Sequence, residues 1–383
     1  MGKFTERTTA PFRYDIVGSF LRPQKLKEAR AAFEKGELSQ EQLTAVEDEA
    51  ILDLVKKEKA AGLKSVTDGE FRRSYWHLDF MWGFEGIEHV HLENGYFFHD
   101  EETRNDSARV SGKIRFAGHP FLAHFKFLKD AAGSDVIPRL CVPAPAQFYA
   151  ELVRGANEAF LDKIYPDREE LYKDLIQAYR DFVKALYEEG CRILQIDDCT
   201  WGMLCDTSFW KTMAGAGYDP EVLKKLYLRL NNGVIEEQPK DLTINTHVCR
   251  GNYHSTWATS GGYGPVAEAL LSEEKVNAYY LEFDDDRSGD FEPLKYVSDG
   301  KLVVLGLITS KRPQLERKDV IKARIREAEQ YVPLDRLCLS TQCGFASTEE
   351  GNILTEEEEW AKIRLVKEIA DEVWGDQPAR IEP

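Results

Sequence analysis

Four residues of types that bind zinc stand at or just after the ends of short apolar runs: His247, Cys249, Glu282 and Cys343. His247 and Cys249 are separated by one residue, and side chains at positions i and i+2 of a strand share a face. Cys343 precedes Gly344, where the chain can turn freely. Two thiolates, an imidazole and a carboxylate would form a tetrahedral Zn²⁺ site. The alternative for each cysteine is a buried structural thiol, because an HxC pair alone is not diagnostic.

Two further apolar runs end in carboxylates. The sequence Asp68-Gly69-Glu70 follows one run and Asp197-Asp198 follows another. Carboxylates at the active face of a barrel can hold a substrate amine or transfer a proton. The alternative for Asp68 or Asp197 is capping of a helix N-terminus. Gly18-Ser19 follows a third run, and its backbone N–H groups and hydroxyl can bind a carboxylate, although the pair is also ordinary turn material.

These residues must be positioned by strands that end at one face of the molecule. We expect eight strands in the apolar runs 15–18, 63–67, 137–142, 192–196, 243–248, 278–281, 302–306 and 337–341. Apolar residues spaced by three and four predict helices over 41–61, 168–189 and 220–236. Ser347 or Thr348, and Thr355, have the character of helix starts. This β-then-α order predicts an α/β fold, a (β/α)8 TIM barrel, as one domain over 1–383.

One region departs from the β-then-α order. Residues 85–121 are rich in Gly, His, Phe and Asn and contain stretches in which apolar and polar residues alternate. We expect an antiparallel β insertion after the second strand. It would cover the barrel mouth as a lid, or form a surface embellishment.

Composition excludes several classes of protein. The 383 residues are 43% hydrophobic and 11% aromatic, enough for a large core. A net charge of -17 argues against a nucleic-acid partner, because phosphate binding needs clustered Lys and Arg. No apolar stretch is long enough to span a membrane and Met1–Tyr14 is polar, so a cytoplasmic location is expected. The seven cysteines do not form a disulfide pattern, and we expect buried thiols at Cys141, Cys191, Cys199, Cys205 and Cys338.

Taken together, these motifs resemble the catalytic C-terminal barrel of the cobalamin-independent methionine synthase family, and in particular its short, single-barrel relatives. The resemblance covers nearly the whole chain. The segments that carry it are Ile16-Val17-Gly18-Ser19-Phe20, Asp68-Gly69-Glu70, Gln195-Ile196-Asp197, Thr246-His247-Val248-Cys249, Leu281-Glu282 and Gln342-Cys343-Gly344.

The resemblance implies a role for each residue that matches. His247, Cys249, Glu282 and Cys343 would bind Zn²⁺ as the cofactor. Ser19 would hold the carboxylate of the substrate amino acid, while Glu70 and Asp197 would receive its ammonium group and serve as the catalytic carboxylates. The implied activity is that of a 5-methyltetrahydropteroyltriglutamate-homocysteine S-methyltransferase, which transfers a methyl group from 5-methyltetrahydrofolate to the homocysteine thiol in methionine biosynthesis.

The chain departs from the family pattern on the side of the methyl donor. The segment Gly306–Pro313 lacks the histidine that long members carry after the seventh strand, and Asp198-Cys199 replaces the family's Glu-Pro after Asp197. The acceptor half of the expected site matches the family and the donor half does not. The small-molecule partners are therefore homocysteine and a methyl donor, either the folate or another donor such as methylcobalamin or a small methylated metabolite.

Two other classes of function remain open at this stage. A zinc hydrolase could use the same barrel, although such sites prefer His and carboxylate ligands, and two Cys ligands argue against one. A non-catalytic protein would keep a structural zinc or bind a thiol amino acid without turnover. The carboxylate ligand and the nearby amino-acid-binding groups argue against that alternative.

Overall fold

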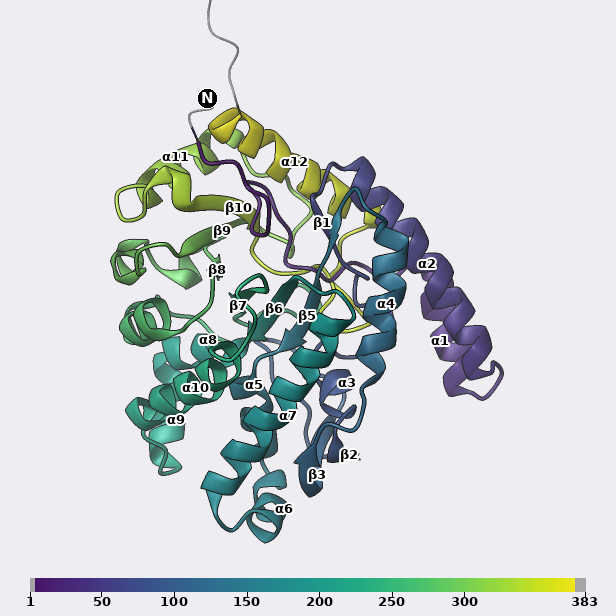
Figure 1. Cartoon of the computed structure of the whole chain (residues 1–383). Coiled ribbons are helices and arrows are strands. Elements are labelled where there is room, and N and C mark those ends of the chain that lie inside the picture. The colour runs from purple at the N-terminus through teal and green to yellow at the C-terminus, as the bar shows by residue number, and fades with distance from the viewer. Residues whose placement is uncertain (1–3, 376–383) are drawn as a thin grey trace, which may run out of the picture.

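A parallel sheet of six strands forms the centre of the computed structural model, which describes residues 4–375 (Figure 1). The strands lie in the order β10-β9-β8-β7-β6-β5. Their bounds are β5 Leu140–Pro143, β6 Ile193–Asp198, β7 Thr243–Val248, β8 Ala278–Glu282, β9 Leu302–Ile308 and β10 Leu337–Thr341. The mixed α/β class and the predicted strands from 192 onward are confirmed.

The remaining strands of the barrel are short or irregular. β1 (Ser65–Val66) pairs in parallel with β4 (Ile137–Pro138), which continues into β5 after one residue. The predicted strand over 15–18 is wrong as a strand: the chain meets β10 in an isolated parallel bridge between Tyr14 and Leu339, in which the Asp15 N–H donates to the Leu339 carbonyl at 3.0 Å. The reason is local. The Asp15 carboxylate accepts hydrogen bonds from the backbone of Phe12 and Ile16, and such bonds compete with a strand ladder.

These pieces nevertheless follow the order of a (β/α)8 barrel. Segment 13–15 extends the sheet at β10, and the hydroxyl of Thr67, just after β1, donates to the carbonyl of Gly18 at 2.6 Å. The parallel register aligns the carboxyl ends of the strands. His247 of β7 is paired with Asp197 of β6 on one side and Tyr280 of β8 on the other. Residues at these strand ends therefore face a common region.

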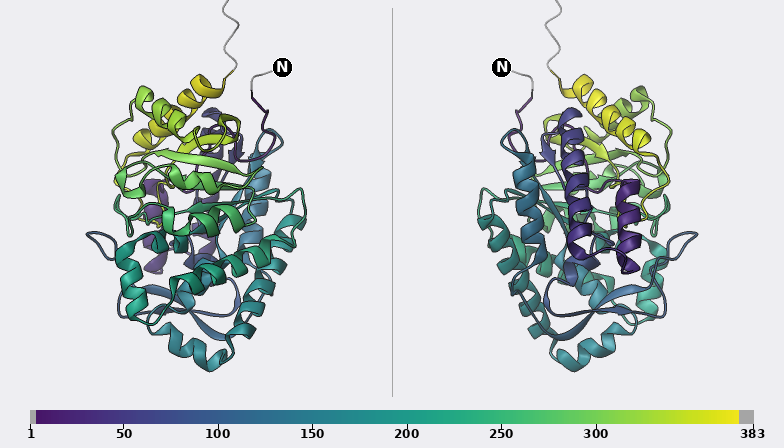
Figure 2. Two further views of the ribbon diagram at one scale, coloured as in Figure 1. Left: turned by 90° about the vertical axis from the view of Figure 1, so that its left-hand side faces the viewer. Right: turned by 90° about the vertical axis from the view of Figure 1, so that its right-hand side faces the viewer.

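Helices cover the outside of the sheet (Figure 1, Figure 2). The predicted helices correspond to α2 (Gln40–Ala60), α7 (Arg168–Glu188) and α10 (Pro220–Ile235), and Thr355 begins α12 (Glu356–Trp374). The other helices are α1 Gln24–Glu34, α3 Leu78–Met81, α4 Pro120–Ala132, α5 Pro145–Leu152, α6 Asn157–Ile164, α8 Cys199–Cys205, α9 Thr207–Gly215 and α11 Lys318–Ala328. Short helical turns are η1 Gly264–Val266, η2 Glu268–Glu273, η3 Asp286–Ser288, η4 Glu292–Tyr296 and η5 Leu334–Arg336.

A helix start at Ser347 or Thr348 is wrong. Thr348 instead forms an antiparallel bridge with Tyr75, which follows β1, so its backbone is taken up by a long-range contact. None of the helices within residues 4–375 is both long and apolar enough to cross a bilayer.

The antiparallel insertion after β1 is present as a hairpin of β2 (Glu85–His91) and β3 (Asp106–Arg115). It lies at one end of the molecule, beside α3 and α6 (Figure 1). β3 packs against α6 and α7, and buried residues of β3 such as Val110 and Ile114 join the main apolar core. The two strands are connected by the loop 92–105, which contributes Tyr96, Phe98 and Thr103 to the lining of a cavity shared with residues at the strand ends.

Candidate metal centre and amino-acid pocket

The four expected zinc ligands come together at the carboxyl ends of β7, β8 and β10. The side chains of His247, Glu282 and Cys343 offer donor atoms that all lie within 4.8 Å of one another. The sulfur of Cys249 lies 3.7 Å from that of Cys343. All four residues are buried. β7 and β8 are neighbours in the sheet, which brings His247 and Cys249 close to Glu282. Cys343 lies just after β10, and its sulfur contacts that of Cys249.

The donor set fits a zinc ion in chemistry and in size. Two sulfurs bound tetrahedrally at about 2.3 Å from one ion lie roughly 3.8 Å apart, close to the separation found between Cys249 and Cys343. The thiols of Cys199 and Cys343 both form hydrogen-bonding contacts with Cys249, and these contacts hold the pKa of Cys249 well below the usual range of a thiol. The same contacts raise the pKa values of Cys199 and Cys343, so Cys249 is the thiol of the three that ionises most readily.

The buried carboxylate of Glu282 is held by cationic and dipolar partners. Its oxygens accept from the backbone N–H of Arg250 at 2.8 Å and from the Arg287 guanidinium at 3.0 Å. Burial raises its pKa to about 7, and the thiolate of Cys249 adds to this while Arg287 opposes it. Arg287 also pairs with Asp284 and Asp285, so the acidic cluster after β8 serves to orient this arginine.

His247 is oriented by a carboxylate, as metal-binding histidines usually are. Its Nδ1 lies 3.2 Å from Asp197 Oδ1, while its Nε2 lies 3.2 Å from the carbonyl oxygen of Gln342. Burial opposes a charge on the ring, but the hydrogen bond to Asp197 and the negative charges of Cys249, Asp197 and Glu282 together outweigh it and raise the pKa of His247 to about 9. Asp197 is itself held by the amide of Gln195 at 2.9 Å.

Two carboxylates lie side by side next to the four-ligand cluster. Glu70 and Asp197 present oxygens that, together with the sulfur of Cys141, lie within 4.8 Å of one another. Burial raises the pKa of Glu70 to about 7, against the opposing charge of Arg73 at 3.4 Å. One oxygen of Glu70 is buried without a hydrogen-bond partner among the described residues. This oxygen still needs a hydrogen-bond donor, and an ammonium group placed between the two carboxylates would supply one.

Ser19 lines the same pocket as these carboxylates. Its hydroxyl accepts from the backbone N–H of Ala346 at 3.3 Å, and Phe345 donates to its carbonyl at 3.0 Å. Ser19, Glu70, Asp197, His247, Cys249 and Cys343 all line one cavity. The structure therefore brings together every residue singled out as a metal ligand or substrate contact.

The alternative interpretation of Asp68 or Asp197 as a helix N-cap is wrong, because residues 69–72 form a turn and α8 is capped by Asp198. Asp198 caps α8 by accepting from the N–H of Thr200 at 2.9 Å, and Asp68 accepts from the N–H of Glu70 at 2.9 Å. Asp68 thereby supports Glu70, whose φ of 62° places it in the left-handed region. Cys141, Cys191, Cys205 and Cys338 are buried free thiols, as expected; Cys199 is partly buried and borders Cys249.

Several residues that line the cavity were not predicted from the sequence. Tyr96 and Phe98 reach the cavity from the loop 92–105, and Asn252 reaches it from the loop after β7. The buried ammonium of Lys311 donates to Asn252 Oδ1 at 2.9 Å and to two carbonyls of the same loop. Lys311 lies in the histidine-free segment 306–313, but its position in the sequence does not indicate that its ammonium group reaches the loop after β7.

Comparison with known proteins agrees with this geometry. Residues 158–371 match the family model described as the catalytic domain of cobalamin-independent synthase. The chain belongs to this family. It is 47% identical over 377 residues to the uncharacterized protein YxjH of Bacillus subtilis, covering 97% of this chain and 98% of that one.

Two solved structures of the cobalamin-independent synthase family resemble this chain. A putative vitamin-B12 independent methionine synthase from Listeria monocytogenes is 38% identical, with a TM-score of 0.76 and coverage of 97% of this chain and 100% of that one. A B12-independent methionine synthase from Shewanella sp. W3-18-1, solved in complex with selenomethionine, shares the fold at 17% identity and a TM-score of 0.68, covering 94% and 97% of the two chains. Membership of the cobalamin-independent synthase family indicates methyl transfer of the methionine synthase type.

Proposed function

We propose that this protein is a zinc-dependent methyltransferase that methylates the thiol of homocysteine to form methionine. The observation that carries the proposal is that two carboxylates, Glu70 and Asp197, line one cavity with His247, Cys249 and Cys343. The buried carboxylate of Glu282 lies within 4.8 Å of the ligand atoms of His247 and Cys343. A substrate that fills this cavity carries an ammonium group at one end and a metal-seeking atom at the other. Homocysteine has both groups, with its thiol separated from the amino-acid carbon by two methylenes.

Each part of the acceptor would have a partner on the chain. The ammonium group would lie between Glu70 and Asp197, and the Ser19 hydroxyl would donate to the substrate carboxylate. Zn²⁺ bound by the four ligands would deprotonate the substrate thiol and keep it nucleophilic. Asp197 has a second task, because it also orients His247. Burial of these groups excludes water and strengthens each ionic contact.

The methyl donor would approach from a second cavity that adjoins the first at Cys249. This cavity is lined by aromatic and apolar side chains of the loop 92–105 and of α8 and α9, among them Phe97, Phe98, Met203 and Phe209. The proposed donor is 5-methyltetrahydrofolate. The sulfur–carbon bond would form as the donor's nitrogen–methyl bond breaks, and that nitrogen would leave with a proton.

One observation favours a second candidate, in which the acceptor is kept and the donor is different. The segment 306–313 has no histidine, and Lys311 uses its ammonium on Asn252 and on the carbonyls of Gly251 and Thr256. A group engaged in this way is poorly placed to protonate a departing folate. A corrinoid or a small methylated metabolite needs no proton at that position.

A single substitution tests the metal-dependent part of the proposal. Cys343→Ser should lose bound zinc, measured by elemental analysis, and lose methionine formation in parallel. Cys338→Ala is the matched control, since Cys338 lies in β10 five residues earlier, is buried, and does not line the cavity. Full turnover by a zinc-free Cys343→Ser enzyme would refute the proposal.

A donor screen separates the two candidates. Zinc-loaded protein and homocysteine would be combined with 5-methyltetrahydrofolate, as mono- and polyglutamate, or with methylcobalamin, and methionine would be measured. Methionine from the folate supports the first candidate, and methionine from methylcobalamin alone supports the second. Tight homocysteine binding without methionine from any donor would instead favour a non-catalytic thiol-binding protein.

A further inference from the structure

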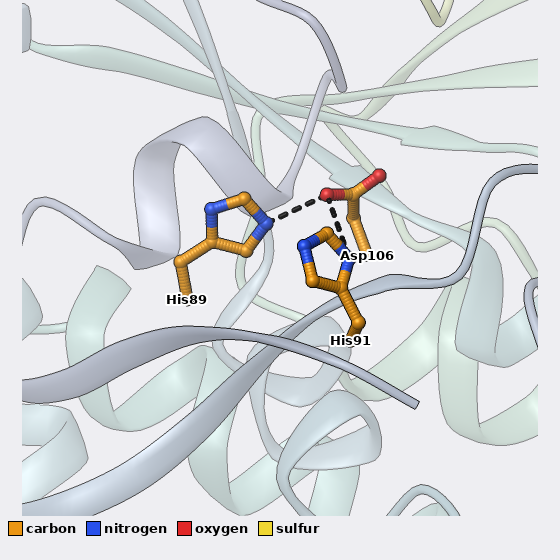
Figure 3. Close-up of side chains that lie close together, drawn as sticks. All are labelled: His89, His91 and Asp106. Carbon is orange, nitrogen blue, oxygen red and sulfur yellow. Dashed lines mark hydrogen bonds and ion pairs between the residues drawn. The ribbon is translucent and has the colours of Figure 1, made fainter. Parts of the chain in front are cut away.

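A second group of metal-binding side chains lies outside the candidate active site, on the β2–β3 hairpin. His89, His91 and Asp106 offer donor atoms that all lie within 4.8 Å of one another (Figure 3). His89 Nε2 is 2.6 Å and His91 Nδ1 is 3.5 Å from the same oxygen of Asp106. We propose that these three residues bind a divalent transition-metal ion, of which Zn²⁺ is the representative, and that this ion fastens the ends of the loop 92–105.

Strand register accounts for the shared direction of the three side chains. His91 lies directly opposite Asp106, and His89 lies opposite Ala108. Positions i and i+2 of one strand point to the same face, as do residues directly opposite one another on two strands. All three side chains therefore leave one face of the hairpin. This arrangement is built by the backbone and does not depend on the rotation of one long side chain.

The ligand set is one that transition metals prefer. Imidazole suits Zn²⁺, Ni²⁺ and Cu²⁺, and two histidines with one carboxylate leave further positions open for water. Two ligand atoms at about 2.0–2.1 Å from one ion in tetrahedral geometry lie roughly 3.4 Å apart. The two measured separations from Asp106, 2.6 and 3.5 Å, lie on either side of that value. An ion that replaces the proton shared by His89 and Asp106 would therefore require only small movements of the three side chains.

The surroundings hold the ligands and leave them accessible. The ring of Trp82 stacks on that of His89 with centroids 4.0 Å apart, and its indole N–H is fixed to the carbonyl of Ser107. The side chains of His89 and His91 are 45% and 65% exposed, so an ion can enter from solvent. Arg104 lies 4.0 Å from the other oxygen of Asp106, but it is drawn away by Glu349 at 2.7 Å.

The position of the cluster links it to the active-site cavity. His91 immediately precedes the loop 92–105 and Asp106 immediately follows it, so an ion bound by both would add a side-chain link to the backbone pairing that already joins the two ends of the loop. The same loop carries Tyr96 and Phe98 into the cavity wall. Its inner contacts include Thr103 N–H to the Tyr96 carbonyl at 3.0 Å and the Tyr96 hydroxyl to His77 at 2.7 Å. Fixing the loop ends would stabilise the loop conformation in which Tyr96 makes these contacts.

Metal stoichiometry tests the site. The full chain would be dialysed against graded free Zn²⁺, and bound metal would be counted by elemental analysis for the native protein and for the His89→Gln, His91→Gln and His99→Gln variants. His99→Gln is the control, because His99 lies in the same loop, exposed, and outside the cluster. We expect the native protein and the control to bind one equivalent more than the other two variants. Loss of a direct ligand should exceed the roughly 10- to 100-fold weakening that loss of an outer partner causes.

Hydrogen exchange tests the fastening of the loop. Added Zn²⁺ should slow exchange of amides in 92–105 in the native protein and in His99→Gln, but not in His89→Gln or His91→Gln. Equal Zn²⁺ stoichiometry and affinity in all four proteins would overturn the site and leave only histidine–aspartate ion pairs. An extra equivalent with unchanged exchange in 92–105 would overturn its role in holding the loop. Neither outcome depends on methyl transfer, so both are separate from the fate of the proposed function.

Discussion

Gly344 lies where any side chain would collide with the serine expected to bind the substrate carboxylate. A Cβ built at this position would stand 1.9 Å from the hydroxyl oxygen of Ser19. Gly344→Ala must therefore displace Ser19, and the KM for homocysteine should rise at least about 10-fold, the effect of losing one hydrogen bond to a charged group. Steady-state kinetics measure this change. Gly264→Ala is the control, since nothing lies within 4 Å of its Cβ position; equal KM values in the two variants would contradict the role of Ser19.

The unpartnered oxygen of Glu70 gives a second prediction at the residue scale. Glu70→Gln keeps the shape of the side chain but removes the charge that would face the substrate ammonium. A hydrogen bond to a charged group contributes about 1.5–3 kcal/mol, so homocysteine binding should weaken by roughly 10- to 150-fold. Calorimetric titration measures the dissociation constant.

A substrate analogue supplies the control for Glu70→Gln. 4-Mercaptobutanoate has the thiol and the carboxylate of homocysteine but lacks the ammonium group. The native protein and Glu70→Gln should bind this thiol equally. If Glu70→Gln weakens binding of both thiols to the same extent, Glu70 acts on the fold of the pocket and not on the ammonium group.

At the scale of elements, a buried carboxyl group joins α10 to the end of η2. Glu274 accepts from the Asn231 amide at 2.8 Å, and the same amide donates to Asp198 at 2.9 Å. Burial raises the pKa of Glu274 to about 8, and the charge of Asp198 contributes. The folded protein thus holds a proton here that the unfolded chain, with a glutamate pKa near 4.3, releases earlier.

This proton predicts how stability depends on pH. The contribution of Glu274 is fully present below about pH 4.3 and is lost as pH rises toward about 8, at up to about 1.4 kcal/mol per pH unit. Glu274→Gln keeps a neutral side chain of the same shape and should remove this slope. Urea unfolding at pH 5, 6.5 and 8 compares the two proteins. Parallel pH profiles would show that Glu274 is ionised in the folded state.

The start of α12 carries a prediction that concerns stability alone. The Thr355 hydroxyl accepts from the N–H of Glu358 at 3.3 Å, and the Glu358 carboxylate accepts from the N–H of Thr355 at 2.8 Å. Thr355→Ala removes one half of this capping box and should cost about 1 kcal/mol of unfolding free energy, with unchanged methyl transfer. Thr355→Ser should retain most of it. A loss of stability as large in Thr355→Ser as in Thr355→Ala would exclude capping as the cause.

The elements differ in how well the sequence predicts them. The five apolar runs from residue 192 onward were found as strands, because these strands are buried on both faces. The long amphipathic helices were found within a residue or two, because each buries one face. Residues 15–18 and Thr348 were mistaken because their backbones are engaged by a side chain or by a distant segment. Such contacts have no local period that a sequence could reveal.

Residues of the candidate site that lie at strand ends could be predicted, whereas those that lie in loops could not. His247 and Cys249 could be found because a strand places i and i+2 on one face, and strand ends bring Glu282 and Cys343 to them. Tyr96, Phe98 and Lys311 could not, since their places depend on a hairpin loop and on the path of the chain after β7 and β9. The position of a loop side chain is set by the tertiary structure around it, and the local sequence pattern does not report that position.

At the scale of the whole molecule, the irregular first strand raises the question of what holds the barrel together near its N-terminal end. A buried ion pair joins three separate parts of the ring. Arg139, between β4 and β5, lies 3.1 Å from Asp15 and donates to the carbonyl of Ile16 at 2.7 Å. The hydroxyl of Tyr280 in β8 donates to Asp15 at 2.9 Å. The side chains of Asp15 and Arg139 are 2% and 0% exposed.

This network replaces the backbone hydrogen bonds of the strand that segment 15–18 does not form. Its loss should lower the free energy of unfolding of the whole protein. Asp15→Asn leaves the Arg139 charge buried without a counter-charge, which should cost about 3–5 kcal/mol, measured as a lower urea midpoint at unchanged slope. The double variant Asp15→Asn with Arg139→Met removes both charges and should be more stable than Asp15→Asn alone. Glu188→Gln, which breaks an exposed pair on α7, should leave the midpoint near that of the native protein. If Asp15→Asn unfolds at the native midpoint, closure of the ring rests on packing and not on this ion pair.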